Sequence, residues 1–200
     1  ELGVSVGSVS GWCSDVVLSQ TQLEKLAKDA KDPNYGKRLE NSQKQHKLSV
    51  AKGEQLLKVG IKAVGKLSKR ELFLVGVALY WAEGFKKDSQ AGLGSSDPEM
   101  ILLFVRWLKD GFGYTNSDLL LRVTVNEAHE YRIGEITEHW SELLGIPIAD
   151  FKKPFYQHVK WKKEYDRPEE YFGVLRVRVR RSKDFLRKIY GYIAGLKQGV

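Results

Sequence analysis

Residues 72–84 read LFLVGVALYWAEG, an almost unbroken apolar run that ends in an acid and a glycine. Ser68 precedes this run and Glu71 follows Ser68 by three residues, which is the pattern of a capping box at the start of a helix. Gly84 is the residue at which such a helix is expected to stop. Because apolar side chains occupy nearly every side of this helix, we expect it to be buried on more than one side and to pack against a partner helix.

Two small residues mark one face of the predicted helix. Ala78 and Ala82 lie four positions apart, so a second helix backbone can approach them closely. Glu83 is the only acid in the last turn, where the helix dipole opposes a negative charge. Glu83 therefore needs a compensating cation, or it is solvated or paired with Lys87, its neighbour four residues on.

The rest of the second half of the chain alternates helical and strand patterns, which predicts an α+β fold. A short polar hairpin over residues 85–95 is followed by a second capping box, from Ser96 to Glu99, with Pro98 in the first turn. The further predicted elements are a helix over 99–111, a strand over 119–125, a helix over 131–144, an antiparallel pair formed by 155–161 and 173–180, and a closing helix over 182–196. The tryptophans expected in the core are Trp81, Trp107 and Trp140.

Residues 77–84, VALYWAEG, together with the sequence SSDPE at residues 95–99, resemble the signature region of the LAGLIDADG homing endonucleases. The resemblance covers roughly residues 70–196. It implies that Ala78 and Ala82 pack helix against helix across a twofold axis, and a single copy of the motif requires a homodimer for this.

The same resemblance implies a metal-dependent DNA endonuclease. Glu83 would bind a catalytic Mg²⁺ ion for phosphodiester hydrolysis, and Lys86 and Lys183 are candidates to assist. Trp81 replaces the penultimate carboxylate of the motif, and the hairpin is shorter than that of cleaving family members. The resemblance therefore also implies an alternative, a non-catalytic helix-turn-helix transcriptional regulator with a degenerate LAGLIDADG domain.

The charge of the chain favours a polyanionic partner. The 200 residues hold 33 Lys and Arg against 25 Asp and Glu, a net charge of +8. Residues 31–70 and 151–190 each carry +8, and the residues between them are acidic. Double-stranded DNA is the expected partner, and a protein of anionic membrane surfaces is the competing class.

Several classes are disfavoured by composition. One cysteine and four scattered histidines give neither a disulfide framework nor a zinc site. No apolar run reaches the roughly 20 residues that span a bilayer. We expect a cytoplasmic protein with no membrane segment.

Residues 174–180 read VLRVRVR, in which apolar and basic residues alternate with the period of a strand. Arg176, Arg178 and Arg180 then share one face of that strand, where we expect phosphate. Trp161 lies among lysines and either stacks on a base or covers the sheet. The other residues expected to contact DNA here are Lys86, Lys87, Lys160, Lys162, Lys163 and Arg181.

The first residues of the chain resemble the second half of a helix-turn-helix. Gly3 would make the tight turn, and Val9 and Trp12 would pack the recognition helix onto its partner. Ser5, Ser8 and Ser10 would face DNA. The competing interpretation is the start of an ordinary surface helix.

Three segments follow from these patterns. Residues 1–35 form a partial helix-turn-helix segment, in which a second helix over Asp15–Lys31 has Ser19 as a plausible N-cap. Residues 36–68 form a basic helical linker, whose lysines can bind backbone phosphate without reading sequence. Residues 69–200 form the LAGLIDADG-like domain.

Overall fold

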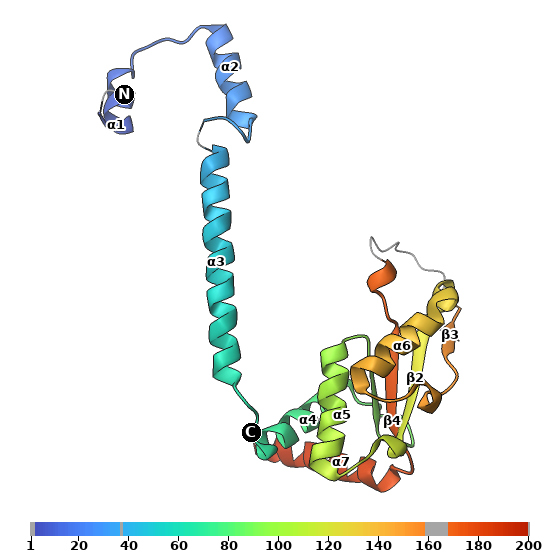
Figure 1. Cartoon of the computed structure of the whole chain (residues 1–200). Helices are drawn as coiled ribbons and strands as arrows, with labels where there is room; N and C mark the ends of the chain where they lie inside the picture. The colour runs from blue at the N-terminus through green and yellow to red at the C-terminus, as the bar shows by residue number, and fades with distance from the viewer. Residues whose placement is uncertain (1–2, 37, 159–167, 200) are drawn as a thin grey trace. The chain divides into compact units, whose positions relative to one another are not determined.

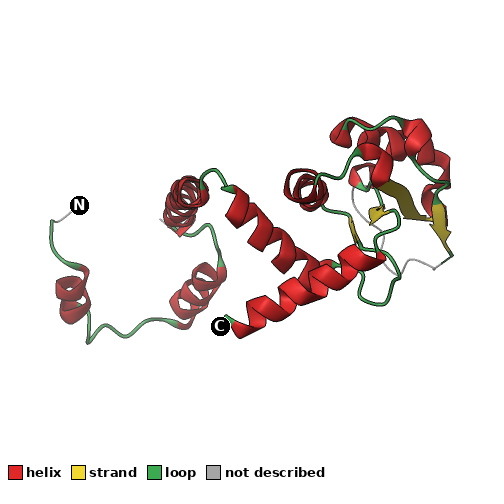
Figure 2. Cartoon of the chain, turned by 90° about the horizontal axis from the view of Figure 1, so that it is seen from below, coloured by secondary structure: helices red, strands yellow, loops and turns green. Residues whose placement is uncertain are grey.

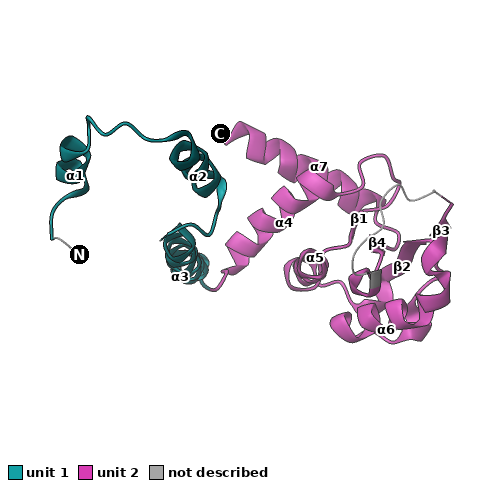
Figure 3. Cartoon of the chain, turned by 90° about the horizontal axis from the view of Figure 1, so that it is seen from above, with its two compact units in different colours: residues 1–65 teal, residues 66–200 magenta. Residues whose placement is uncertain are grey.

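The structure is a computed structural model that describes residues 3–36, 38–158 and 168–199 (Figure 1). Backbone contacts divide the chain into two compact units, residues 1–65 and residues 66–200 (Figure 3). The first unit is helical, and the second combines helices with a sheet, so the chain is of the α+β type.

The first unit holds helices α1 (Val6–Trp12), α2 (Gln20–Lys31) and α3 (Arg38–Val64). None of its described residues is buried. The expected packing of Val9 and Trp12 onto a partner helix is therefore wrong, because these side chains are 40% and 65% exposed. With only 7 residues, α1 offers too little surface to hold a partner by itself.

Helix α2 begins later than expected. Ser19 is its N-cap and forms a capping box with Gln22, which confirms that part of the prediction. The predicted start at Asp15 is wrong, because Ser19 is extended and ends the helix on that side. Helix α3 confirms the predicted helical segment, as one continuous helix of 27 residues.

The second unit is built on a four-stranded sheet with the order β1-β4-β2-β3 (Figure 2). Its strands are β1 (Gly92–Ser95), β2 (Leu119–Asn126), β3 (Phe155–Gln157) and β4 (Val174–Val179). Strand β4 runs antiparallel to both β1 and β2, and β3 runs parallel to β2. The predicted antiparallel pairing of 155–161 with 173–180 is therefore wrong: β2 lies between β3 and β4.

Four helices complete the second unit: α4 (Lys69–Glu83), α5 (Pro98–Phe112), α6 (Ile133–Leu144) and α7 (Lys183–Gln198). Short 3-10 turns connect the elements at Asn116–Asp118, Glu127–Arg132, Ile148–Asp150 and Pro168–Glu170. Helix α4 packs against α5, α7 and β1, and α5 also contacts β4. The expected partner helix for α4 is thus found within its own chain.

The helix caps explain where α4 and α5 begin. Ser68 and Glu71 form the predicted capping box of α4. The N-cap of α5 is Asp97 rather than Ser96, and its carboxylate accepts from the backbone N–H groups of Glu99 and Met100. Pro98 occupies the first helical position, so the residue just before it must be the cap.

The core lies between the sheet and its helices. Every second residue of β4 is buried, and so are most residues of β2. Trp107 and Trp140 are fully buried as predicted, whereas the expectation for Trp81 is wrong because its side chain is 43% exposed. A helix that is apolar on all sides needs only two covered faces, and Trp81 lies on the uncovered one.

Within the described residues, no helix is long and apolar enough to pass through a bilayer.

Candidate nucleic-acid interface

Strand register gathers three arginines on one face of the sheet. Arg176 and Arg178 of β4 alternate with the buried Leu175, Val177 and Val179. Arg122 of β2 lies directly opposite Arg176. Successive residues of a strand point to opposite faces, so Arg122, Arg176 and Arg178 form one cationic surface, called the arginine face below.

Glycines in the neighbouring strand shape this face. Gly92 pairs with Arg178, and Gly94 pairs with Arg176. A Cβ atom at Gly92 would come within 2.9 Å of Phe85 Cδ2, so the absent side chain leaves room for the Phe85 ring. Phe85 therefore lies against the strand edge.

The Phe85 ring holds two of the guanidinium groups. The Cζ atoms of Arg176 and Arg178 lie 4.7 Å and 5.2 Å from its centroid. Such cation–π contacts stabilise a charged group and fix the plane of the guanidinium. The arginine face is thus pre-ordered by an aromatic support.

The arginine face carries more positive than negative charge. Asp88 is the acidic residue paired with it, with Oδ2 accepting from Arg178 Nη2 at 2.5 Å. Burial lowers the pKa of the Arg176 guanidinium from its ordinary value, and the charges of Arg178 and Arg122 lower it further. A lowered arginine pKa marks a place where positive charges repel one another, and an anion bound there would be favoured.

Two pockets adjoin the face. One, of about 180 Å³, is lined by Leu120, Arg122, Lys152, Arg176 and Arg178. The other, of about 420 Å³, is lined by Gly84, Phe85, Lys86, Lys87, Asp88 and Arg176. Arg176 lines both pockets, so the cationic surface extends from the sheet to the loop that follows α4.

Two tyrosines anchor that loop. The Tyr80 hydroxyl donates to the carbonyl oxygen of Phe85 at 2.9 Å, and the Tyr190 hydroxyl donates to that of Lys86 at 2.8 Å. Burial raises the pKa of Tyr80 to about 12, so its hydroxyl stays a donor at neutral pH. The loop position is therefore set by α4 and α7 together.

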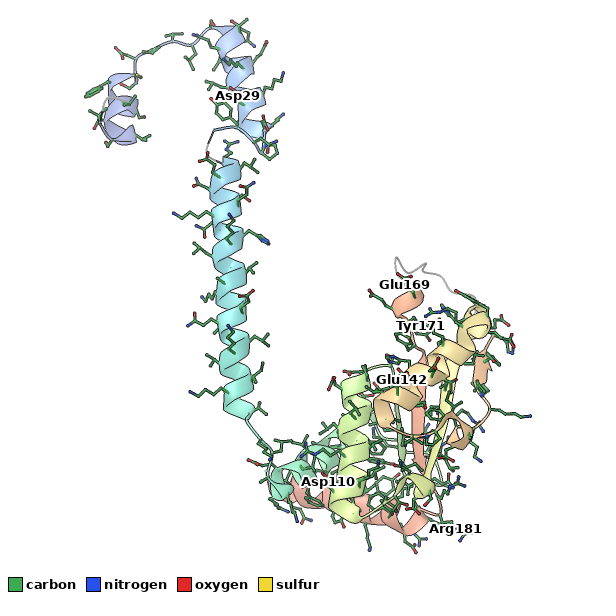
Figure 4. All side chains as sticks on the ribbon, in the orientation of Figure 1. Asp29, Asp110, Glu142, Glu169, Tyr171 and Arg181 are labelled. Atoms are coloured by element: carbon green, nitrogen blue, oxygen red, sulfur yellow. The ribbon has the colours of Figure 1, made fainter. Side chains whose placement is uncertain are left out.

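The predicted DNA contacts fall into separate places. Arg180 and Arg181 are exposed at the end of β4, and Arg181 has a positive φ of 50° (Figure 4). Lys86 and Lys87 are exposed beside the larger pocket. Lys160, Lys162 and Lys163, with Trp161, lie outside the described residues.

The serines predicted to face DNA belong to the first unit. Ser5 is the N-cap of α1, and its Oγ accepts from the backbone N–H of Ser8 and lies 2.9 Å from the Ser8 Oγ. Ser10 is exposed. The hydroxyls of Ser5 and Ser8 therefore serve the helix start.

Glu83 is exposed at the last position of α4 and forms no ion pair with Lys87 or any other described residue. Lys86 Nζ donates to the Ala82 carbonyl oxygen at 2.8 Å and so caps the helix end. Lys183 begins α7, seven residues before Tyr190, which corresponds to about 10 Å along the helix axis. The predicted catalytic set is therefore not gathered around one point, because Lys86 is engaged by backbone and Lys183 lies at the far end of α7.

The described part of the chain contains no group of three or more His, Cys, Asp or Glu residues that could hold a metal ion. Glu83 is a single carboxylate. One protomer thus does not fit a divalent cation by itself, and such an ion would need the Glu83 of a second copy.

Ala78 and Ala82 lie on the uncovered side of α4. Both are exposed, together with Val75 at 38% and Trp81 at 43%. These four residues form an apolar strip, called the α4 strip below. The chain's own core does not cover it.

Sequence reasoning missed Arg122, Lys152, Phe85 and Asp88. Arg122 carried a signal, because it shares the parity of Leu120 within the predicted strand. Lys152 carried none: it is placed by its backbone N–H, which donates to the Leu121 carbonyl oxygen at 2.8 Å.

Comparisons with protein-family models, with curated proteins and with solved structures found no match.

Proposed function

We propose that this chain binds the backbone of double-stranded DNA through the arginine face. The observation that carries the proposal is the register that brings Arg122, Arg176 and Arg178 together with one paired carboxylate among the described residues. Guanidinium groups match phosphate oxygens in geometry and stay charged at all physiological pH values. The expected binding is dominated by phosphate and is strongly salt-dependent.

The test is duplex binding measured by fluorescence anisotropy over a series of salt concentrations. Replacement of Arg176 and Arg178 by Gln is expected to weaken binding and to reduce the slope of log K against log salt by about 0.9 for each phosphate that is no longer neutralised. Arg106→Gln is the matched control, because Arg106 pairs with Asp110 on the exposed side of α5 (Figure 4). Unchanged affinity and slope in the double variant would remove the arginine face from DNA binding.

A homodimer joined through the α4 strip is the second part of the proposal. Small side chains at Ala78 and Ala82, with apolar neighbours Val75 and Trp81, suit close contact between two copies of α4. The Glu83 residues of both copies would then approach each other. The expected mass in analytical ultracentrifugation is that of a dimer.

Ala78→Glu tests the interface, because it places a charge in the middle of the strip. This variant is expected to be monomeric, whereas Ala149→Glu, at an exposed alanine in a 3-10 turn, should remain dimeric. A dimeric Ala78→Glu variant would show that the α4 strip is not the interface.

Mg²⁺-dependent DNA cleavage is a second candidate function, favoured by the exposed Glu83 beside the α4 strip. Its test is plasmid nicking with Mg²⁺ by the wild type, by Glu83→Gln and by the control Glu142→Gln, at an exposed acid of α6 (Figure 4). Loss of nicking in Glu83→Gln alone supports a nuclease. Duplex binding with no nicking by the wild type instead supports a non-catalytic regulator.

A further inference from the structure

The smaller pocket beside the arginine face is lined by four cationic side chains and, among the described residues, by no carboxylate. Arg122, Lys152, Arg176 and Arg178 surround about 180 Å³, and Leu120 forms the remaining lining. Arg122 and Arg176 come from directly opposed positions of two strands. Their separation is therefore fixed by the sheet and does not depend on a loop.

The lysine of the pocket is also held in place. Its backbone N–H donates to Leu121, and the preceding residue, Phe151, forms a bridge with Leu121. Lys152 consequently lies beside β2, the strand that supplies Arg122. An aliphatic stem with a terminal ammonium group can adjust its reach to a bound anion.

Arg178 is only partly used by its protein partner. Asp88 engages one terminal nitrogen, Nη2, and it lines the larger pocket rather than the smaller one. The Nε atom of Arg178 is buried and has no hydrogen-bond partner among the described residues. A buried donor without a partner costs free energy that an acceptor entering the pocket would recover.

We infer that the pocket of Arg122, Lys152, Arg176 and Arg178 is an oxyanion site for one phosphate group, and that Asp88 weakens this site by neutralising Arg178. The inference rests on the proposed function where the phosphate belongs to a DNA backbone. A free phosphate ion offers the same chemistry, and the experiment separates these two sources. With Asp88 paired to Arg178, the other three cations of the pocket suit an anion with several acceptor oxygens.

Asp88 acts on this site as an internal competitor. Its carboxylate occupies a guanidinium edge that a phosphate oxygen would otherwise engage. Asp88→Asn keeps the shape of the side chain and removes the charge. Arg178 then becomes available to the bound anion, and the affinity for phosphate and for DNA rises.

The experiment measures binding of inorganic phosphate by thermal shift and binding of a short duplex by anisotropy, on the full chain. Lys152→Gln and Arg122→Gln are expected to lose the phosphate-induced rise in Tm and to bind duplex more weakly, by about tenfold or more for one charge-assisted hydrogen bond. Asp88→Asn is expected to bind both more tightly by a similar factor. Asp110→Asn is the matched control: it makes the same charge change on α5, and it should leave both affinities unchanged.

The outcomes distinguish the pocket from the proposed function. Phosphate binding that depends on Lys152, without duplex binding, supports the pocket as a site for a free ion and contradicts the proposed function. Duplex binding that depends on Lys152, without binding of the free ion, supports the pocket as a backbone-phosphate site.

Two results would overturn the inference. One is wild-type binding of duplex and phosphate by both Lys152→Gln and Arg122→Gln, which would leave DNA binding by other residues intact. The other is an equal gain of affinity in Asp88→Asn and Asp110→Asn, which would show that net charge, rather than release of Arg178, is responsible.

Discussion

The two faces of the same sheet differ in what their side chains do. On the inner face, Leu175, Val177 and Val179 are fully buried under the helices. On the other face, Arg176 and Arg178 alternate with them and remain partly exposed. One strand of six residues thus serves stability with one parity and charge with the other, so substitutions one position apart should have unlike effects.

The largest effect is expected from the inner face. Leu175→Ala removes a fully buried side chain and leaves a cavity, which should lower the free energy of unfolding by about 2–5 kcal/mol. Urea unfolding followed by circular dichroism measures this change. A loss below that of an ordinary surface substitution would mean that the inner face is not a packed core.

A smaller loss is expected where the helices covering this face are already full. A Cβ atom at Gly76 of α4 would lie 2.0 Å from Trp107 Cδ1, and the rigid indole cannot move aside cheaply. Gly76→Ala should therefore cost about 1–3 kcal/mol of unfolding free energy. Gly191→Ala, in α7, is the control: nothing lies within 4 Å of its added Cβ, so helix propensity should make it neutral or stabilising, and a stabilising Gly76→Ala would contradict the packing.

The pH dependence of stability sharpens the same contrast. The pKa of Tyr80 is raised to about 12 by burial, above its ordinary value of about 10. The stabilising preference for the neutral phenol is therefore fully present below pH 10 and is lost as pH rises through 12. We expect Tm to fall over this range, and Tyr80→Phe to have a shallower fall; equal slopes in the two proteins would contradict a buried phenol.

The slope should be reduced rather than abolished in Tyr80→Phe. Burial also raises the pKa of Tyr114, which remains in the variant and acts with the same sign.

The smallest effect on stability is expected beside the first substitution. Arg176→Gln should change the free energy of unfolding by no more than about 0.5 kcal/mol, because the side chain is only partly buried and no backbone bond depends on it. The same urea series measures it against Leu175→Ala. A loss as large as that of Leu175→Ala would mean that Arg176 is a structural residue.

Local patterns were sufficient to predict several elements. The capping box of Ser68 and Glu71 fixed the start of α4, and the alternation of 174–180 fixed β4 and its two faces. Both signals involve residues within a few positions of each other, so the local sequence specifies them. The position of Asp97 as a cap was also readable, since Pro98 follows it.

Features that depend on distant residues were not predictable in this way. The parallel pairing of β3 with β2 depends on a long connection through α6, and periodicity does not encode strand order. Trp81 was placed in the core because its helix is apolar on every side, and only the packing of α5 and α7 shows which side stays open. The arginine face combines residues of two strands for the same reason.

The most direct measurement is an NMR titration of the full chain with a short DNA duplex, following the arginine Nε–H signals and the backbone amides. The arginine face predicts the largest shifts at Arg122, Arg176 and Arg178 and in the backbone of β2 and β4, with little change at Arg106. Shifts confined to the lysines of the first unit, with the three arginine signals unmoved, would contradict the assignment of DNA binding to this sheet.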